Sequence, residues 1–479
     1  MKLLKQNTPL LVLIFLFIFS IFMFAEETET DLQKKTESEE LSDYDKKLET
    51  LKYGLDTEVI ALTENLKKNE DTRFNEELQK ILAKSKNPKV KYAVMDLFSA
   101  QKNDAIRDDA LKILSEFYDY KSEVVLASIK YCKELEITEA SEHLRKIIKD
   151  DNSEYRVPAI LTLGKLGNSE DAEFLVECFE NESNPDSKIS LITRQHIMEA
   201  LMELHEEATW DFLLYTAEDS YENAIIRARA ATALGKIGKP EAVNVLSKLY
   251  EDKDPAIREA AVKGLTNFSN EEAKAVLIEA FKDSYYKVRL QAVKSAEESK
   301  NQEAIPYILY RAKTDPEEVV KFAAIKALSA SQDSKSLTWL KERFLEPKTG
   351  ERMRIKIAGE LLEYNFDFIV DDVNKTAMKA LKDTRLKRFA INLGSRISKI
   401  ENAASANLAE AYLMHSDPMV QSVGLDMFKT NSYAELIPKI QEIAAQKKNS
   451  AIKRRAKVLL ELKNIPVKSN EDDVKGFEE

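Results

Sequence analysis

A column of basic residues recurs along the sequence in a way that could bind carboxylates. Each member follows the first apolar position of a repeated phrase, and successive members are 31 to 38 residues apart. Ten of its twelve members are Lys or Arg, and the column runs through Lys91, Val125, Arg156, Arg194, Arg227, Arg258, Arg289, Lys321, Lys356, Lys387, Gln421 and Arg454. Guanidinium and ammonium groups donate charge-assisted hydrogen bonds to carboxylates, so carboxylate binding is the chemistry that this column offers.

Residues that could catalyse a reaction do not gather in the sequence. A metal site needs converging ligands, whereas His143, His196, His205 and His415 are scattered over distant repeats. Neither cysteine has a histidine nearby in sequence, and the chain has neither a G-x-S-x-G elbow nor a glycine-rich phosphate loop. The sequence therefore predicts no catalytic residue, no metal and no cofactor. Cys132 and Cys178 are expected as core residues of two helices, and whether they are bridged stays open.

The elements that carry the basic column are predicted to be helices. The 479 residues include only 11 Gly and 12 Pro, too few for the tight turns of a β-rich or α/β chain. In the phrase PAIREAAVKGLTNF the apolar positions are three and four residues apart, and NEEAKAVLIEAF repeats this pattern. The two inward-facing stripes are Ile257, Ala261, Leu265 and Phe268, then Ala273, Val276, Leu277 and Phe281. Each repeat is therefore predicted to be a helical hairpin.

Turn residues mark the expected helix ends. Asp or Asn followed by Pro predicts an N-cap and a first helical residue at Asn87-Pro88, Asn184-Pro185, Asp254-Pro255, Asp315-Pro316 and Asp417-Pro418. Four glycines are expected where a first helix stops and the chain reverses, namely Gly164, Gly167, Gly235 and Gly238.

The phrases IIRARAATALGKIGKPEAV and DPAIREAAVKGL resemble HEAT repeats, in particular the short HEAT-like repeats of bacterial scaffold proteins. The resemblance covers about 89–463 and implies a right-handed α-solenoid of about twelve hairpins. The period is shorter than the 40–47 residues or so of typical HEAT units. Tetratricopeptide and ankyrin repeats are the rivals, but their signature residues are not at the required offsets.

The resemblance also implies a role for the basic column. In HEAT-like proteins an acidic residue in the turn between repeats and a basic residue a few positions later form a ladder along the solenoid. Here Asp254 with Arg258, Asp283 with Arg289 and Asp315 with Lys321 are the expected rungs, and Arg156 and Arg227 are further members. The favoured interpretation is structural stitching of neighbouring repeats. The alternative is that an unpaired part of the ladder binds carboxylates of a partner.

Aromatic residues recur on two consecutive second helices of the aligned repeats. Tyr307 and Trp339 share a column with Val245 and Val276, which predicts core packing. Tyr310 falls in a solvent-facing column with Lys248, Glu279 and Glu342, which makes it a candidate protein-binding residue.

The ends of the chain predict export. Lys2 and Lys5 precede an apolar run over 10–25, which is typical of a signal peptide cleaved after Ala25, with an uncleaved membrane anchor as the alternative. We expect an acidic tether over 26–47, an N-terminal helical cap over 48–88, the solenoid over 89–465 and an acidic tail over 466–479. Location is thus expected to be periplasmic or otherwise extracytoplasmic.

Charge narrows the class of partner. The formal net charge is −11, and removal of the two leader lysines makes it −13 (−11 − 2). An acidic body repels nucleic acid, so the expected partners are proteins. The sequence thus favours a non-catalytic scaffold or adaptor. The alternative is a HEAT-like enzyme, similar to bilin lyases or metal-dependent hydroxylases.

Overall fold

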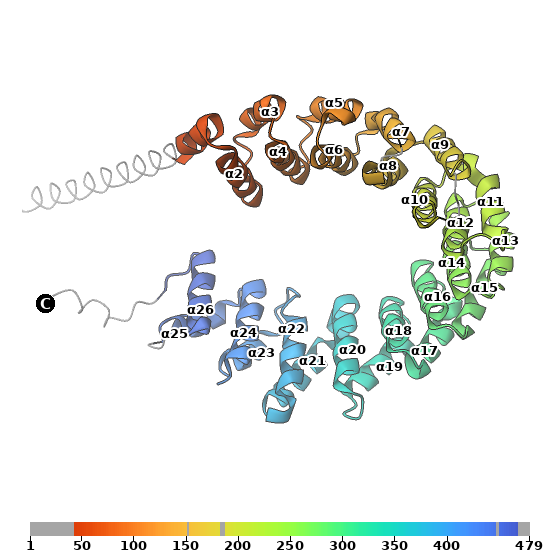
Figure 1. The fold of residues 1–479 in the computed structure, drawn as a ribbon. Helices are drawn as coiled ribbons and strands as arrows, with labels where there is room; N and C mark the ends of the chain where they lie inside the picture. The colour runs from red at the N-terminus through yellow and green to blue at the C-terminus, as the bar shows by residue number, and fades with distance from the viewer. Residues whose placement is uncertain (1–42, 151–152, 183–186, 447–449, 468–479) are drawn as a thin grey trace, which may run out of the picture. The chain divides into compact units, whose positions relative to one another are not determined.

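The chain is all-helical wherever the structure, a computed structural model, describes it: residues 43–150, 153–182, 187–446 and 450–467 (Figure 1). The chain divides into two compact units, Met1–Leu213 and Leu214–Glu479. The expected leader over 1–25, most of the tether, nearly all of the tail and the expected cap at Asn184-Pro185 lie outside the described residues.

In the described part of the first unit, a helix over 43–53 is followed by ten further α-helices. These are α2 (Asp56–Lys68), α3 (Asn75–Lys84), α4 (Pro88–Ala100), α5 (Arg107–Ser115), α6 (Ser122–Glu134), α7 (Ser141–Lys149), α8 (Ser153–Leu166), α9 (Ser169–Glu180), α10 (Lys188–Leu204) and α11 (Trp210–Glu218), of which α11 spans the division. Within this unit α4, α6, α8 and α10 pack side by side, and α5, α7 and α9 form a second layer (Figure 1).

The second unit repeats the same arrangement. Its helices are α12 (Ala224–Ile237), α13 (Ala242–Leu249), α14 (Pro255–Leu265), α15 (Glu271–Glu279), α16 (Tyr286–Glu298), α17 (Ile305–Thr314), α18 (Glu318–Ala330), α19 (Ser334–Leu345), α20 (Glu351–Tyr364), α21 (Phe366–Leu381), α22 (Lys387–Ile397), α23 (Ala406–Leu413), α24 (Pro418–Asn431), α25 (Ile437–Ala444) and α26 (Ala451–Leu462). The even-numbered helices, which we call anchor helices because they carry the basic column, pack against one another in order. The odd-numbered helices are the second helices of the hairpins. This confirms the predicted all-α solenoid class.

The cores of the hairpins follow from the predicted apolar stripes. In α14 and the turn after it, Ile257, Ala261 and Leu265 are buried, whereas Phe268 is only half-buried. In α15 and the short 3₁₀ turn that follows it, Ala273, Leu277 and Phe281 are buried. Each large apolar side chain removed from water in this way stabilises the stack by about 1.5–3 kcal/mol. Since a single hairpin cannot bury its stripe alone, the neighbouring hairpin supplies the other wall of the core.

Three of the described Pro-marked caps are confirmed. Asn87, Asp254 and Asp417 are N-caps whose side chains accept hydrogen bonds from the amides of Lys89, Ala256 and Met419, and a Pro follows each cap. Asp315 is different, because α18 begins after Glu317 and Asp315 ends the preceding helix α17. The prediction of an N-cap at Asp315 was therefore wrong. Its carboxylate instead pairs with Arg289.

The glycines divide into two roles. Gly238 ends α12 with φ +77°, the left-handed conformation that the predicted helix stop requires. Gly164 and Gly235 instead lie inside α8 and α12, so the prediction of a stop at these positions was wrong. A Cβ on Gly235 would lie 2.3 Å from Cα of Gly264, and one on Gly164 would lie 2.6 Å from Cα of Ala200. Glycine is present at both positions because anchor helices approach each other there.

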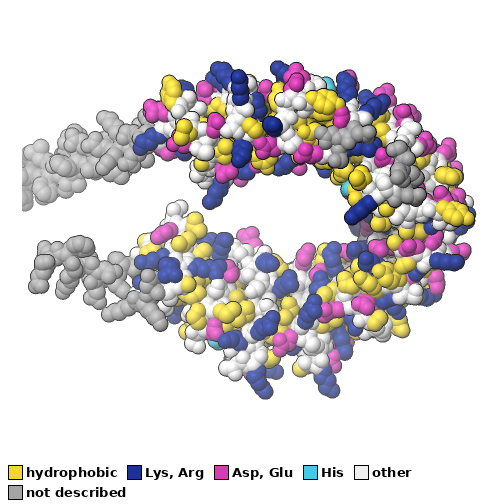
Figure 2. All heavy atoms as spheres, viewed as in Figure 1, with side chains coloured by type: hydrophobic (Ala, Val, Ile, Leu, Met, Phe, Trp, Pro, Cys, Tyr) yellow, Lys and Arg dark blue, Asp and Glu magenta, His cyan; other side chains and the backbone are white. Residues whose placement is uncertain are grey.

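The predicted boundaries near the N-terminus differ from the observed elements. Residues 43–47, expected in the tether, belong to the helix over 43–53. The region expected as a separate cap, 48–88, contains α2 and α3, and α2 packs on α4 as the later anchor helices pack on one another. In each of the two units, cationic and anionic side chains are interspersed over the face seen in Figure 2.

Candidate functional site

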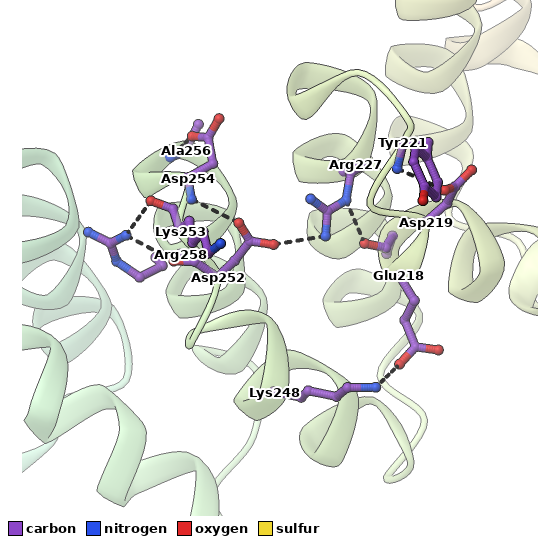
Figure 3. A network of polar contacts seen from close by, with 11 residues as sticks. Glu218, Asp219, Tyr221, Arg227, Lys248, Asp252, Lys253, Asp254, Ala256 and Arg258 are labelled. Atoms are coloured by element: carbon purple, nitrogen blue, oxygen red, sulfur yellow. Dashed lines mark hydrogen bonds and ion pairs between the residues drawn. The ribbon is translucent and has the colours of Figure 1, made fainter.

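The basic column forms a ladder along the second unit, and its first rung is seen in Figure 3. Arg227 of α12 donates from Nη2 to Oδ2 of Asp252 at 2.9 Å and from Nε to the carbonyl of Ala217 at 3.1 Å. Asp252 also accepts a hydrogen bond at 2.8 Å from the amide of Asp254, the residue that caps α14. One aspartate thus links the arginine of one anchor helix to the start of the next.

The second and third rungs are bidentate. Arg258 donates from Nε and Nη2 to the two carboxylate oxygens of Asp283 at 2.8 and 2.9 Å. Arg289 holds Asp315 in the same way, with both bonds at 2.8 Å. In addition, Nη1 of Arg258 and of Arg289 donates to two backbone carbonyls of its own preceding turn. Each arginine therefore joins two successive turns, a geometry that suits its planar fork.

The partners in these rungs are displaced by one repeat from the expected ones. Arg258 pairs with Asp283 rather than with Asp254, and Arg289 pairs with Asp315 rather than with Asp283. The reason is the reach of the arginine, whose Nη1 bonds to carbonyls of its own preceding turn while Nε and Nη2 extend to the aspartate 25 or 26 residues onward. In the first unit Arg156 likewise reaches Glu182 at 3.1 Å.

Burial makes these rungs electrostatically strong. Asp315 is fully buried and Arg289 is 6% exposed. Burial alone would raise the pKa of Asp315, but the hydrogen bonds from Arg289 and the amide of Glu317, with the nearby arginine charges, hold that pKa below its ordinary value. Asp283 has its pKa lowered by the corresponding bonds from Arg258 and the amide of Tyr285, again against the effect of burial. The charged pair is therefore the stable form.

The ladder is interrupted at Lys321 of α18. The spacing of the preceding rungs would place its acidic partner at 346 or 347, and Glu346 stands there. Glu346 is instead bonded to Arg343 at 2.7 Å and to the Thr349 hydroxyl at 3.1 Å. Within the described part of the chain, no hydrogen bond or ion pair joins the Lys321 ammonium to a carboxylate, and Asp315 is bound by Arg289 and Arg311.

Arg354 takes the next position in the column, a role that the sequence analysis gave to Lys356. Arg354 donates from Nε to the carbonyl of Phe344 at 2.7 Å, ten residues earlier, as Arg227 does to Ala217. Lys356 instead bonds to Glu360 of its own helix. The spacing of the column could have identified Arg354, because this residue is 33 residues from both Lys321 and Lys387. Further along, Lys387 pairs with Asp417 at 2.6 Å.

A pocket of about 360 Å³ opens beside the interrupted rung. We call it the open-rung pocket. Its lining contains three cations, Lys313, Lys321 and Arg343, and no acidic residue, and its apolar wall includes Trp339, Met353 and Ile357. The Lys313 ammonium lies over the Trp339 ring at 5.4 Å. Nε of Arg343 is buried without a hydrogen-bond partner.

Trp339 and Tyr307 are not the core residues that the alignment predicted. Both are half-buried, as are Val245 and Val276 in the same column. This column lies at the edge of the buried stripe, and both rings contact the preceding hairpin: Tyr307 stacks on Phe281 at 5.9 Å, and Trp339 contacts Lys313. The alignment therefore grouped residues that share an environment, but it predicted that they are more deeply buried than they are.

The solvent-facing column is exposed, as its alignment indicated. Tyr310 is 56% exposed, and the Arg311 guanidinium lies 4.7 Å from its ring centre. Lys248 pairs with Glu218 at 2.9 Å and Glu279 with Lys282 at 2.7 Å, while Glu342 is also exposed. The four residues stand on four consecutive second helices, α13, α15, α17 and α19, so they form a row rather than a cluster.

The histidines and cysteines lie apart in the described residues. His143 is in α7, His196 in α10, His205 at the end of α10 and His415 between α23 and α24. No group of three or more His, Cys, Asp or Glu residues that could hold a metal occurs in the part of the chain described. Cys132 and Cys178 are both free thiols, on α6 and α9. Within the same described residues, no helix has the length and apolarity needed to cross a membrane.

Stacked helical hairpins joined by a buried ladder of Arg–Asp bonds define a HEAT-type helical repeat protein. The chain belongs to the spirochaete HEAT repeat protein family, whose model matches residues 51–459. This covers both units and includes the hairpin of α2 and α3 that was expected to be a separate cap.

Several solved structures are similar to this chain at low sequence identity. Kap121p is 11% identical with a TM-score of 0.40, and the match covers 84% of this chain and 51% of that one. YibA of E. coli is 18% identical with a TM-score of 0.35, with coverage of 62% and 96%. Human deoxyhypusine hydroxylase is 14% identical with a TM-score of 0.26, with coverage of 61% and 96%. This chain thus spans about half the length of Kap121p. A search of curated proteins found no match.

Proposed function

We propose that this HEAT repeat protein is a non-catalytic scaffold or adaptor that binds other proteins along its repeat surface, in an extracytoplasmic compartment. The observation that carries the proposal is the regular row of exposed positions on the second helices, of which Tyr310 is the aromatic member. Tyr and Arg are enriched among the residues that dominate protein interfaces, and Tyr310 lies against Arg311. The cations of the ladder, by contrast, mostly form hydrogen bonds that join neighbouring repeats.

The extracytoplasmic location is supported by the sequence of residues 1–25, with its two lysines and apolar run. N-terminal sequencing of the protein isolated from its own cells would test this part. A mature chain that starts at Glu26 and fractionates outside the cytoplasm is the expected result. An intact N-terminus on a cytoplasmic protein would contradict the proposed location.

Photo-crosslinking in intact cells tests the binding function. A photoreactive phenylalanine analogue placed at position 310 should capture one or a few discrete proteins. The matched control carries the same analogue at Lys263, an exposed anchor-helix position away from the row of second-helix residues. Capture at 310 but not at 263 supports a partner on this row. Equal, diffuse labelling at both positions, or stoichiometric iron in the purified protein, would overturn the scaffold proposal.

A further inference from the structure

The open-rung pocket is a place where the repeat lacks the carboxylate that its neighbours contain. At two consecutive boundaries before it, an anchor-helix cation meets an aspartate of the next turn. At the following boundary the cation is Lys321, and the nearest acidic residue in register, Glu346, is bound by Arg343 and Thr349. The pocket is therefore built on a frame that holds carboxylates elsewhere, yet no carboxylate of the described chain fills it.

The pocket also carries an excess of positive charge. Its lining contains three cations and no acidic group. Arg343 already has one acidic partner, but its buried Nε has no hydrogen-bond partner. Lys313 lies against the Trp339 ring rather than a carboxylate. Lys321 is half-buried, so an anion that reached it would be partly shielded from water. A charge pair shielded in this way is screened less by salt than one on the open surface.

The apolar wall restricts what accompanies the anion. Trp339, Met353 and Ile357 also line the pocket, and Trp339 is only half-buried. An aromatic or aliphatic side chain next to the anion would cover this wall and gain buried area, with Trp339 as the flat contact surface. A bare inorganic anion would leave the wall unused.

We propose, on the basis of the scaffold function above, that the open-rung pocket binds an acidic segment of a protein partner. A carboxylate side chain of that segment bonds to Lys321 and completes the interrupted rung, and a neighbouring apolar side chain packs on Trp339. The partner is thus held by the same Lys or Arg to carboxylate chemistry that joins the repeats. This chemistry is directional and charge-assisted, which gives selectivity for acidic segments over neutral ones.

A labelled peptide provides the direct test. The probe is a fluorescein-labelled peptide, Gly-Ser-Glu-Phe-Asp-Glu-Ser-Gly, measured by fluorescence anisotropy with the purified chain. The matched peptide carries Gln and Asn in place of the acids. We expect the acidic peptide to bind and the amide peptide to bind at least about tenfold more weakly, since each lost charge-assisted bond lowers affinity by about that factor.

Two variants connect binding to the pocket. Lys321→Met keeps an unbranched apolar side chain one atom shorter than that of lysine and removes the charge, and it should weaken binding of the acidic peptide by about tenfold or more. Lys294→Met removes an exposed lysine of the neighbouring anchor helix α16 and should leave affinity unchanged. Equal binding of the two peptides, or unchanged affinity in Lys321→Met, would overturn the proposal.

Other anions give a distinguishable result. Binding of inorganic phosphate and of phosphatidylglycerol vesicles is also measured for wild type and for Lys321→Met. Lys321-dependent binding of either one, without binding of the acidic peptide, would overturn the assignment of a protein carboxylate. The crosslinking at position 310 does not depend on Lys321. Discrete capture there together with failed peptide binding would reject the pocket and leave the scaffold, whereas peptide binding without capture would reject the proposed row.

Discussion

Arg289 and Asp315 face each other across a repeat boundary and are joined by two parallel hydrogen bonds of 2.8 Å. The two side chains are 7% and 0% exposed, so the pair is buried in the stack. Asp315 also accepts the amide of Glu317 at 3.0 Å, and Arg289 donates to the carbonyl of Asp283 at 3.0 Å. A single ion pair therefore connects the turn before α16 with the turn before α18.

Removing one partner of this pair should destabilise the second unit strongly. Asp315→Ala leaves the Arg289 guanidinium buried without its counter-charge, which costs about 3–5 kcal/mol of the free energy of unfolding. Urea denaturation followed by circular dichroism measures the loss. Glu279→Ala is the matched control, because its pair with Lys282 is 57% exposed on both sides and should change stability by less than about 1 kcal/mol. Similar losses in the two variants would show that the buried rung is not specially stabilising.

The ladder also predicts a dependence of stability on pH. The pKa values of Asp283 and Asp315 are lowered in the folded chain, because their hydrogen bonds from arginines and amides outweigh the effect of burial. Their contribution is therefore complete above the unfolded pKa of about 3.9 and is lost as pH falls through the lower folded values. The stability advantage of wild type over Asp315→Asn should be constant above about pH 5 and should shrink below about pH 4. An advantage that shrinks between neutral pH and pH 5 would contradict this assignment.

The repeat architecture could be predicted because each hairpin repeats one local pattern. The apolar stripe of α14, the cap at Asp254 and the helix stop at Gly238 depend only on residues close in sequence, and all three are observed. The basic column was visible for the same reason. The pattern predicted the cations of the rungs, except that it assigned Lys356 to a position that Arg354 takes in the structure.

Contacts between repeats could not be predicted in this way. The partner of Arg258 depends on how far its side chain reaches in space, and the structure places Asp283 there rather than Asp254, which is nearer in sequence. The open-rung pocket was missed because Glu346 stands in register in the sequence, and only the structure shows that it is bonded to Arg343 and Thr349 instead of Lys321. Trp339 seemed to belong to the core because it aligns with apolar residues such as Val245 and Val276, which are themselves only half-buried.

Close approach of α12 and α14 should be sensitive to a single methyl group. In Gly235→Ala the new Cβ would lie 2.3 Å from Cα of Gly264, so the helices must separate, at a cost of about 1–3 kcal/mol. Gly350→Ala is the control, because no atom lies within 4 Å of its Cβ, and it should change stability by no more than about 1 kcal/mol. Thermal unfolding distinguishes the two. A Gly235→Ala protein as stable as wild type would mean that the helices do not meet at this glycine.

The thiol of Cys132 should be inert in the folded chain. Burial raises its pKa to about 12, and its side chain is 0% exposed, so little thiolate forms and no reagent reaches it. In a Cys178→Ser background, Ellman's reagent should react with Cys132 only after urea is added. Stoichiometric reaction under native conditions would contradict the buried position of this residue.

Lys321 and Arg289 occupy equivalent positions in the column, yet replacing Arg289 should lower stability strongly and replacing Lys321 should hardly change it. Arg289→Met removes the counter-charge of fully buried Asp315 and should cost about 3–5 kcal/mol of unfolding free energy. Lys321 has no acidic partner among the described residues, so Lys321→Met should stay within about 0.5 kcal/mol of wild type, as substitutions away from buried networks do. Urea midpoints of the two variants measure the contrast directly. If Lys321→Met were as unstable as Arg289→Met, Lys321 would be a closed structural rung, and its role would be packing rather than ligand binding. A stable Lys321→Met protein that has lost the acidic peptide separates binding from folding at this one position.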